Sequence, residues 1–175
     1  MLDFLIQALG IAGITLTFFI FSARKRSTIL LCKFTGDIVW FFHYLFIGAT
    51  SGAAMNIVNM LREIIFYNKG KKWATSRFWL FLFVALNLIS SLLTWEGPLS
   101  LLPMLGSSCT VVSFWCTKPL HIRLVAIPGQ SLWLLYGILH FSPTSIISNT
   151  ISLISIGVGL YKDLREMKES KAEPQ

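Results

Sequence analysis

Charged residues are scarce in this chain of 175 residues, and their scarcity excludes an ordinary soluble domain. Only 13% of the residues are charged, whereas 54% are hydrophobic, and the mean hydropathy is +0.67. Soluble domains carry about 25% charged residues. The apolar runs are roughly 17 to 23 residues long, enough to cross a hydrocarbon core of about 30 Å as helices. These properties predict an all-α membrane protein.

Acidic residues are also few, 8 against 15 basic ones, but this imbalance does not indicate a nucleic-acid partner. The basic residues gather in or near the first, third and fifth loops and the tail, whereas the N-terminus and the even loops carry only Asp3 and Glu96. The positive-inside rule therefore predicts an outside N-terminus and a cytoplasmic C-terminus. Because Asp3 replaces a basic n-region and the basic residues 24–26 follow the first span, that span does not resemble a secretion signal.

Patterns typical of catalytic, metal or cofactor sites are missing. Cys32, Cys109 and Cys116 lie in or beside apolar segments without metal-ligand spacing, so we interpret them as small core residues. His43 and His140 are solitary, which favours interfacial positions over metal binding. No nucleophile–base pair, zinc motif or phosphate-binding glycine loop occurs. The sequence thus predicts no enzyme, no cofactor and no metal.

Seven apolar spans account for most of the chain, and turn residues such as Gly48, Gly97 and Pro143 separate them. Because the connections are short, consecutive helices are expected to run antiparallel and side by side. The expected spans are residues 3–22, 27–48, 51–68, 78–95, 98–116, 119–140 and 143–161.

An internal repeat relates the two halves. Residues 33–56 return without a gap, 93 residues later, as residues 126–149, and the Trp-to-Asn spacing of 16 is kept. Further identities fall every four residues along one helix face, which indicates a duplicated fold. The aligned pairs are Leu9/Leu102, Gly13/Gly106, Thr17/Thr110, Phe21/Phe114, Lys25/Lys118, Ile29/Ile122, Trp40/Trp133 and Asn56/Asn149.

The repeat covers spans one to three and five to seven and leaves the fourth without a counterpart. Since each repeat has an odd number of spans, the fourth span is needed to start both repeats from the same side. We therefore predict seven transmembrane helices in a 3+1+3 arrangement, with two parallel three-helix-bundle repeats. The expected parts are a first repeat at 1–71, a linker helix at 72–97, a second repeat at 98–162 and a tail at 163–175.

Residues 101–149 carry an LLP followed by a glycine, the junction W-C-T-K-P-L-H-I-R, and a Trp-rich span before a short turn. These motifs resemble the YgjV-type bacterial inner-membrane family, and the resemblance extends over nearly the whole chain. That family is similar to the SWEET, SemiSWEET and PQ-loop (MtN3-like) transporters, in which two three-helix bundles enclose a path for small solutes. The resemblance implies a multi-pass protein of the bacterial inner membrane.

In the SWEET-like group, a Trp on the second helix and an Asn on the third helix of each bundle line the solute pocket. The resemblance carries these substrate-binding roles to Trp40 with Asn56 and to Trp133 with Asn149. A buried amide and an indole face suit a sugar-like ligand. The alternative is that the Asn side chains bridge helices and the Trp rings pack.

Hinge prolines of SWEET bundles are matched in only one half. Pro103 and Pro128 stand in the second repeat, whereas Gly10 and Thr35 occupy the equivalent positions of the first. A rocking motion supported by prolines is therefore less well founded for the first bundle.

Asp37 is the most unusual residue for a membrane interior, because a buried charge needs a partner or a proton. One interpretation is an ion pair with Lys33, one turn earlier. The other is a titrating carboxyl coupled to transport, with Gln130 as its neutral counterpart in the second repeat. Asn59 and Ser152 extend the polar stripes of the third and seventh spans and are further pocket candidates.

The neighbouring residues Arg62 and Glu63 predict a salt bridge at the inner membrane interface.

The first functional hypothesis is a transporter for a small polar solute. The second is a non-transporting membrane receptor or assembly factor of the same fold. The expected partners are a small-molecule solute and the lipid bilayer, and the sequence leaves room for a homo-oligomer.

Overall fold

The computed structural model describes residues 2–22, 26–68, 70–116 and 119–172. These residues form seven α-helices and two short 3₁₀ helices and contain no strand, which confirms the all-helical prediction. The basic residues Arg24, Lys25 and Lys118 lie outside the described ranges. The elements are α1 (Leu2–Ser22), α2 (Arg26–Phe46), α3 (Thr50–Tyr67), η1 (Lys72–Thr75), α4 (Phe78–Leu93), η2 (Pro98–Ser100), α5 (Leu101–Trp115), α6 (Pro119–Leu139) and α7 (Pro143–Ala172).

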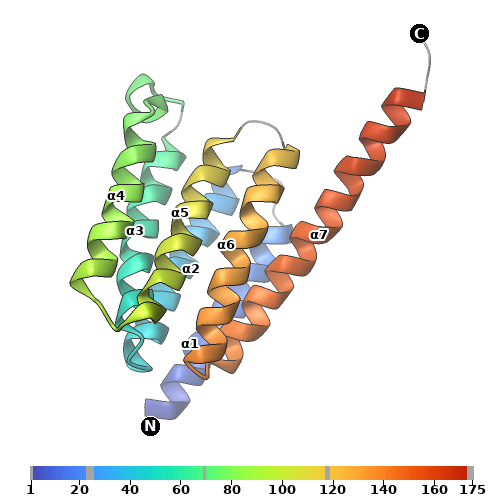
Figure 1. Cartoon of the computed structure of the whole chain (residues 1–175). Helices are drawn as coiled ribbons and strands as arrows, with labels where there is room; N and C mark the ends of the chain where they lie inside the picture. Colours follow the sequence, from blue (N-terminus) through green and yellow to red (C-terminus); the bar gives the residue numbers. More distant parts are fainter. Residues whose placement is uncertain (1, 23–25, 69, 117–118, 173–175) are drawn as a thin grey trace.

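Six of the helices form a closed ring. Going around it, α1 contacts α2, α2 contacts α3, α3 contacts α5, α5 contacts α6, α6 contacts α7, and α7 contacts α1 again. Helix α4 lies outside the ring against α3 and α5 (Figure 1), where Phe83 packs with Val58 and Val111. Side chains that point inward from the six helices therefore meet in a common central space.

Polarity is inverted relative to a soluble protein, and α4 illustrates this. Its Phe81, Leu88 and Leu93 are exposed, whereas Asn87 and Ser91 are buried. Asn87 donates to Ser108 Oγ of α5 at 3.3 Å. An apolar outer surface and an interior that holds the polar groups are what a hydrocarbon solvent requires.

Of the seven predicted spans, three correspond to helices that are long and apolar enough to cross a membrane. Within the described residues these are Ser27–Phe46, Leu120–Leu139 and Pro143–Arg165, and shorter apolar helices occur at Asp3–Thr17, Phe78–Leu93 and Pro98–Ser113. Helix α3 is not among the three, because the polar stripe around Asn56 and Asn59 lowers its mean hydropathy.

Helix α7 extends beyond the predicted membrane span. That span was expected to end at residue 161, and the mixed-charge tail was expected to form a frayed, soluble helix. In the structure one continuous helix reaches Ala172 and runs well beyond the ring (Figure 1). The segment after Leu160 contains many strong helix formers and no proline up to that point, so nothing terminates the helix. Arg123 of α6 also holds this part, because it donates to Gly159 O at 2.6 Å and pairs with Asp163.

Candidate functional site

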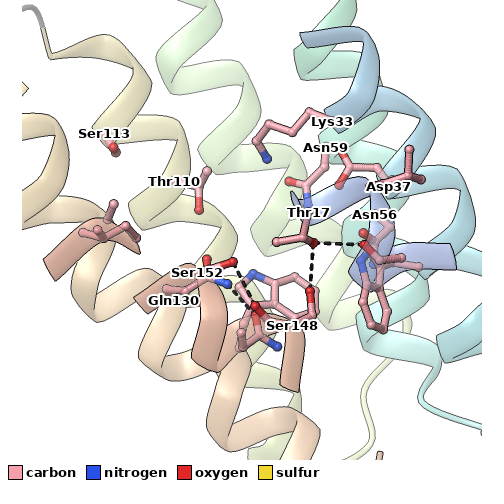
Figure 2. Close-up of a pocket in the computed structure, with 18 of the residues that line it drawn as sticks. Thr17, Lys33, Asp37, Asn56, Asn59, Thr110, Ser113, Gln130, Ser148 and Ser152 are labelled. Atoms are coloured by element: carbon pink, nitrogen blue, oxygen red, sulfur yellow. Dashed lines mark hydrogen bonds between the residues drawn. The ribbon is translucent and has the colours of Figure 1, made fainter. Parts of the chain in front are cut away.

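A cavity of about 300 Å³ occupies the centre of the ring (Figure 2). Its lining residues come from α1, α2, α3, α5, α6 and α7, and no described residue of α4 contributes. All eight residues predicted to bind solute or to couple transport lie on this cavity, namely Trp40, Asn56, Trp133, Asn149, Asp37, Gln130, Asn59 and Ser152. Their roles in binding remain predictions, but the sequence identified a set that the fold brings together.

Each of the two tryptophans lies against a glycine of a neighbouring helix. A methyl group added at Gly13 of α1 would lie 2.6 Å from Trp40 Cε2, and one added at Gly106 of α5 would lie 2.9 Å from Trp133 Cδ1. Such distances are too short for any real side-chain atom, so only glycine allows these approaches. Gly13 and Gly106 are aligned positions of the sequence repeat, and so are the two tryptophans.

The two asparagines make the same local bond. Asn56 Nδ2 donates to Gly52 O at 2.8 Å, and Asn149 Nδ2 donates to Ser145 O at 2.8 Å, four residues back in each helix. Asn149 also bridges helices, because its Oδ1 accepts from Gln130 Nε2 of α6 at 2.5 Å. The helix-bridging interpretation thus holds for Asn149 in addition to its position on the cavity.

Hydroxyl groups that the sequence analysis did not propose as site residues also line the cavity. Thr17 Oγ1 of α1 and Ser148 Oγ of α7 lie 2.9 Å apart (Figure 2). Thr17 also donates to Gly13 O, and Thr110 donates to Gly106 O, both at 3.0 Å. Thr17 and Thr110 are identical at aligned positions of the repeat, which was the one sequence signal for them. That signal did not show that these side chains face the cavity.

One wall of the cavity, formed by α2 and α3, carries charged residues. Arg62 Nη2 lies 2.7 Å from Glu63 Oε1, and Lys33 Nζ lies 3.6 Å from the same oxygen. Both side chains are 1% exposed, so the pair is buried within the protein, and its predicted location at the inner membrane interface stays a prediction. The salt bridge itself was expected. Its burial is possible because both cations share one carboxylate inside the protein.

Asp37 lies on the same wall and is 7% exposed. Lys33 and Arg62 are the cations that act on its charge, which agrees in part with the expected partnership with Lys33. Lys33 also reaches Glu63, however, so the proposed i, i+4 pair is only one element of a larger group. Within the described part of the chain, Asp37 Oδ2 and Asn59 Oδ1 are buried without a hydrogen-bond partner.

An aromatic layer closes the cavity toward the turns that precede α3 and α7. Tyr44 Oη of α2 lies 2.6 Å from Ser145 Oγ of α7, and the Gly52 amide of α3 donates to Tyr136 Oη of α6 at 2.9 Å. The Tyr44 ring lies 5.6 Å from Trp133 and 5.7 Å from Tyr136 between centroids. Both tyrosines are fully buried. We call these rings, Tyr44, Trp133 and Tyr136, the aromatic layer.

His43 is buried within the protein near the end of α2, and its predicted position at the membrane interface stays a prediction. The side chain is 1% exposed. Its Nδ1 lies 3.1 Å from Ile6 O and its Nε2 lies 2.7 Å from Ser142 Oγ. Because α1 and the turn before α7 provide these partners, His43 links both halves of the sequence just beyond the aromatic layer.

Comparison with known proteins identifies a family. No curated protein and no solved structure matches the chain. Residues 4–167 match the family model Imp-YgjV, described as a bacterial inner membrane protein. The match spans both halves of the sequence and confirms the expected family and membrane. The chain therefore belongs to the Imp-YgjV family of bacterial inner membrane proteins.

Proposed function

We propose that this protein transports a small polar, sugar-like solute through the central cavity. The observation that carries the proposal is a cavity to which six helices contribute and on which Trp40, Trp133, Asn56 and Asn149 all lie. Its volume of about 300 Å³ is at the lower end of the range of about 300–1,000 Å³ for ligand pockets, which favours a small solute. The function involves no catalytic step, cofactor or metal.

The proposal includes a 3+1+3 architecture similar to that of SWEET transporters, in which α4 joins two parallel repeats. Contacts at aligned positions support it. Gly13 meets Trp40 as Gly106 meets Trp133. When α1–α3 are aligned with α5–α7, the contact of α3 with α5 also has a counterpart in the contact of α7 with α1. Equal contacts at equal sequence offsets are expected when one fold has been built twice.

Transport in this scheme alternates access to the cavity from the two ends. The aromatic layer and its bonds to Ser145 and Gly52 close one end, which the distribution of basic residues predicts to face the outside. Opening that end requires α2 to separate from α7 and α6 to separate from α3. The hydrogen bonds of Tyr44, Tyr136 and His43 and the tilted ring contacts form a barrier that solute binding would have to shift.

Recognition would use the groups already on the cavity. The indole faces of Trp40 and Trp133 offer apolar stacking surfaces for a sugar ring. Asn149 Nδ2 bonds both Ser145 O and Ser145 Oγ inside its own helix, whereas Asn56 uses one amide proton on Gly52 O and retains further donor and acceptor capacity. Asp37 is the candidate for coupling to a proton.

Flux into liposomes tests this function. Purified protein should accelerate uptake of a subset of small polyhydroxyl or amino solutes, and Asn56→Ala or Asn149→Ala should lower that flux at least about tenfold, the effect of losing about 1.4 kcal/mol of binding. Asn68→Ala is the matched control. Asn68 Nδ2 makes the same kind of bond, to Ile64 O four residues back at 2.9 Å, but Asn68 does not line the central cavity.

Solute binding without any flux would contradict the transport proposal. The non-transporting receptor or assembly factor would then be the better interpretation. Equal loss of flux in Asn68→Ala and Asn56→Ala would show that the substitutions act through folding instead of through the cavity.

A further inference from the structure

The charged wall of the cavity presents two acceptor atoms that have no donor. Asp37 Oδ2 and Asn59 Oδ1 are both buried without a hydrogen-bond partner among the described residues. Each side chain is 7% exposed and lines the cavity. Figure 2 places Asp37 and Asn59 on the same side of it, with Lys33 farther along α2. Buried acceptors of this kind are costly unless a ligand or water supplies donors.

The neighbouring cations do not remove this need. Arg62 and Lys33 both approach Glu63 Oε1, at 2.7 and 3.6 Å. Lys33 and Arg62 also act on Asp37 through space, so the four side chains together carry no net charge when all are ionised. They therefore form a balanced set that does not repel a cationic group near Asp37, while the carboxylate oxygen still lacks a donor.

An ammonium group suits two acceptors on one wall of the cavity better than a hydroxyl group does. It carries three donors and no acceptor, whereas a hydroxyl brings one donor and two lone pairs that would face Asp37 Oδ2 and Asn59 Oδ1. Trp40 lies one turn from Asp37 on α2 and lines the same cavity. Its indole face attracts a cation in addition to stacking on a ring.

The opposite wall differs at the aligned positions. Gln130 stands where the first half has Asp37, and Ser152 stands where it has Asn59. Gln130 donates to Asn149, and Ser152 donates to Ser148 O at 3.0 Å. This wall is neutral, and the Ser152 hydroxyl and one N–H group of Gln130 are already used, so the two walls suit different ends of one asymmetric solute.

We propose that the solute carries a primary amine, which binds as an ammonium group to Asp37 Oδ2 and Asn59 Oδ1, while its neutral part faces α6 and α7. This inference rests on the proposed function and narrows its substrate class. Charge-assisted hydrogen bonds to the carboxylate orient the solute across the cavity.

Matched probes test the amine subsite in purified full-length protein. Glucosamine is compared with glucose, and ethanolamine with ethylene glycol, by isothermal titration in detergent. The amine of at least one pair should bind at least about tenfold more tightly than its hydroxyl partner. Asp37→Asn should reduce that ratio to less than about twofold, and Asn59→Ser should weaken amine binding without abolishing the preference. Asp163→Asn, which removes a carboxylate from α7 outside the cavity, should leave the ratio unchanged.

Three results would overturn the subsite: no amine binding, equal binding within both pairs, or a preference that survives Asp37→Asn. An equal heat response to sodium chloride alone would assign the acceptors to an inorganic cation and would also overturn it. The outcomes separate the two proposals. Amine-selective binding without liposome flux would contradict only the transport proposal. Flux of neutral solutes without an amine preference would contradict only the amine subsite.

Discussion

Buried charge is concentrated at one group of residues, and its energetic weight differs from that of the charges at the surface. Glu63 holds Arg62 and Lys33 at 2.7 and 3.6 Å, and both Arg62 and Glu63 are 1% exposed. The pair formed by Arg123 and Asp163 is 33% and 18% exposed. Desolvation makes an uncompensated charge expensive only in the first case.

Glu63→Gln is therefore expected to destabilise the protein by about 3–5 kcal/mol, because it leaves two cations without their shared carboxylate. Asp163→Asn, at the more exposed pair, should cost less than about 1 kcal/mol. Unfolding by a denaturing detergent, followed by circular dichroism, measures both. Equal effects would mean that the buried group contributes no more than the exposed pair.

Gly13 is predicted to be irreplaceable for packing reasons. A methyl group there would lie 2.6 Å from Trp40 Cε2, so Gly13→Ala should cost about 1–3 kcal/mol through overpacking. Gly157→Ala is the control of opposite sign, because nothing lies within 4 Å of the added atom and alanine favours the helix by about 0.5–1 kcal/mol. Thermal unfolding of both variants checks this, and a neutral Gly13→Ala would contradict the close approach of Trp40.

At the scale of elements, α3 begins without a cap of its own. Ala49 stands at its N-cap position and supplies no side-chain bond. The first-turn amides bond instead to distant groups: Ser51 N donates to Glu96 Oε1 at 3.1 Å, and Gly52 N donates to Tyr136 Oη at 2.9 Å. The turn before α5 and the end of α6 thereby satisfy donors that a helix otherwise leaves open.

Glu96→Ala should accordingly destabilise the protein by about 1–2 kcal/mol, the usual cost of losing a helix cap. Glu96→Gln retains an acceptor oxygen and should recover most of that loss. Hydrogen exchange at Ser51, which should be faster in Glu96→Ala, provides the direct measurement. Unchanged exchange would show that the turn does not cap α3.

At the scale of the whole molecule, the orientation in the membrane is predicted from the distribution of charge. The helices alternate in direction, so α1 begins at one end of the ring and α7 leaves the other (Figure 1). Among the described residues, Arg26, Lys71, Lys72 and Arg77 belong to helix starts and a loop at the end from which α7 extends (Figure 1). This predicts that a reporter fused after Gln175 is active in the cytoplasm, and that one fused before Leu2 is active outside. A periplasmic signal from the C-terminal fusion would reverse the assignment and the side to which the closed end faces.

The apolar exterior and the ring of helices have the same physical cause, the lipid environment. Lipid offers no hydrogen bonds, so polar side chains such as Asp37 and Asn59 must face protein or a cavity. Six helices provide enough inward surface to enclose them, and α4 packs outside these helices, where Phe83 contacts Val58 and Val111.

The sequence alone determined the helical class and the membrane environment, because hydropathy is a local signal. The resemblance to SWEET-like proteins pointed to Trp40, Asn56 and their counterparts, and the repeat at fixed offset paired them, whereas the cavity hydroxyls of Thr17 and Thr110 were not proposed. The tail was expected to form a frayed helix, but its continuity with α7 up to Ala172 was not predicted.

Tertiary structure decided what depends on distances between halves. The burial of His43, the sharing of Glu63 by two cations, and the contacts of Tyr44 and Tyr136 with α7 and α3 join residues far apart in the chain. No local pattern encodes such pairings, because periodicity fixes the direction of a side chain on its helix but not the neighbour that it meets.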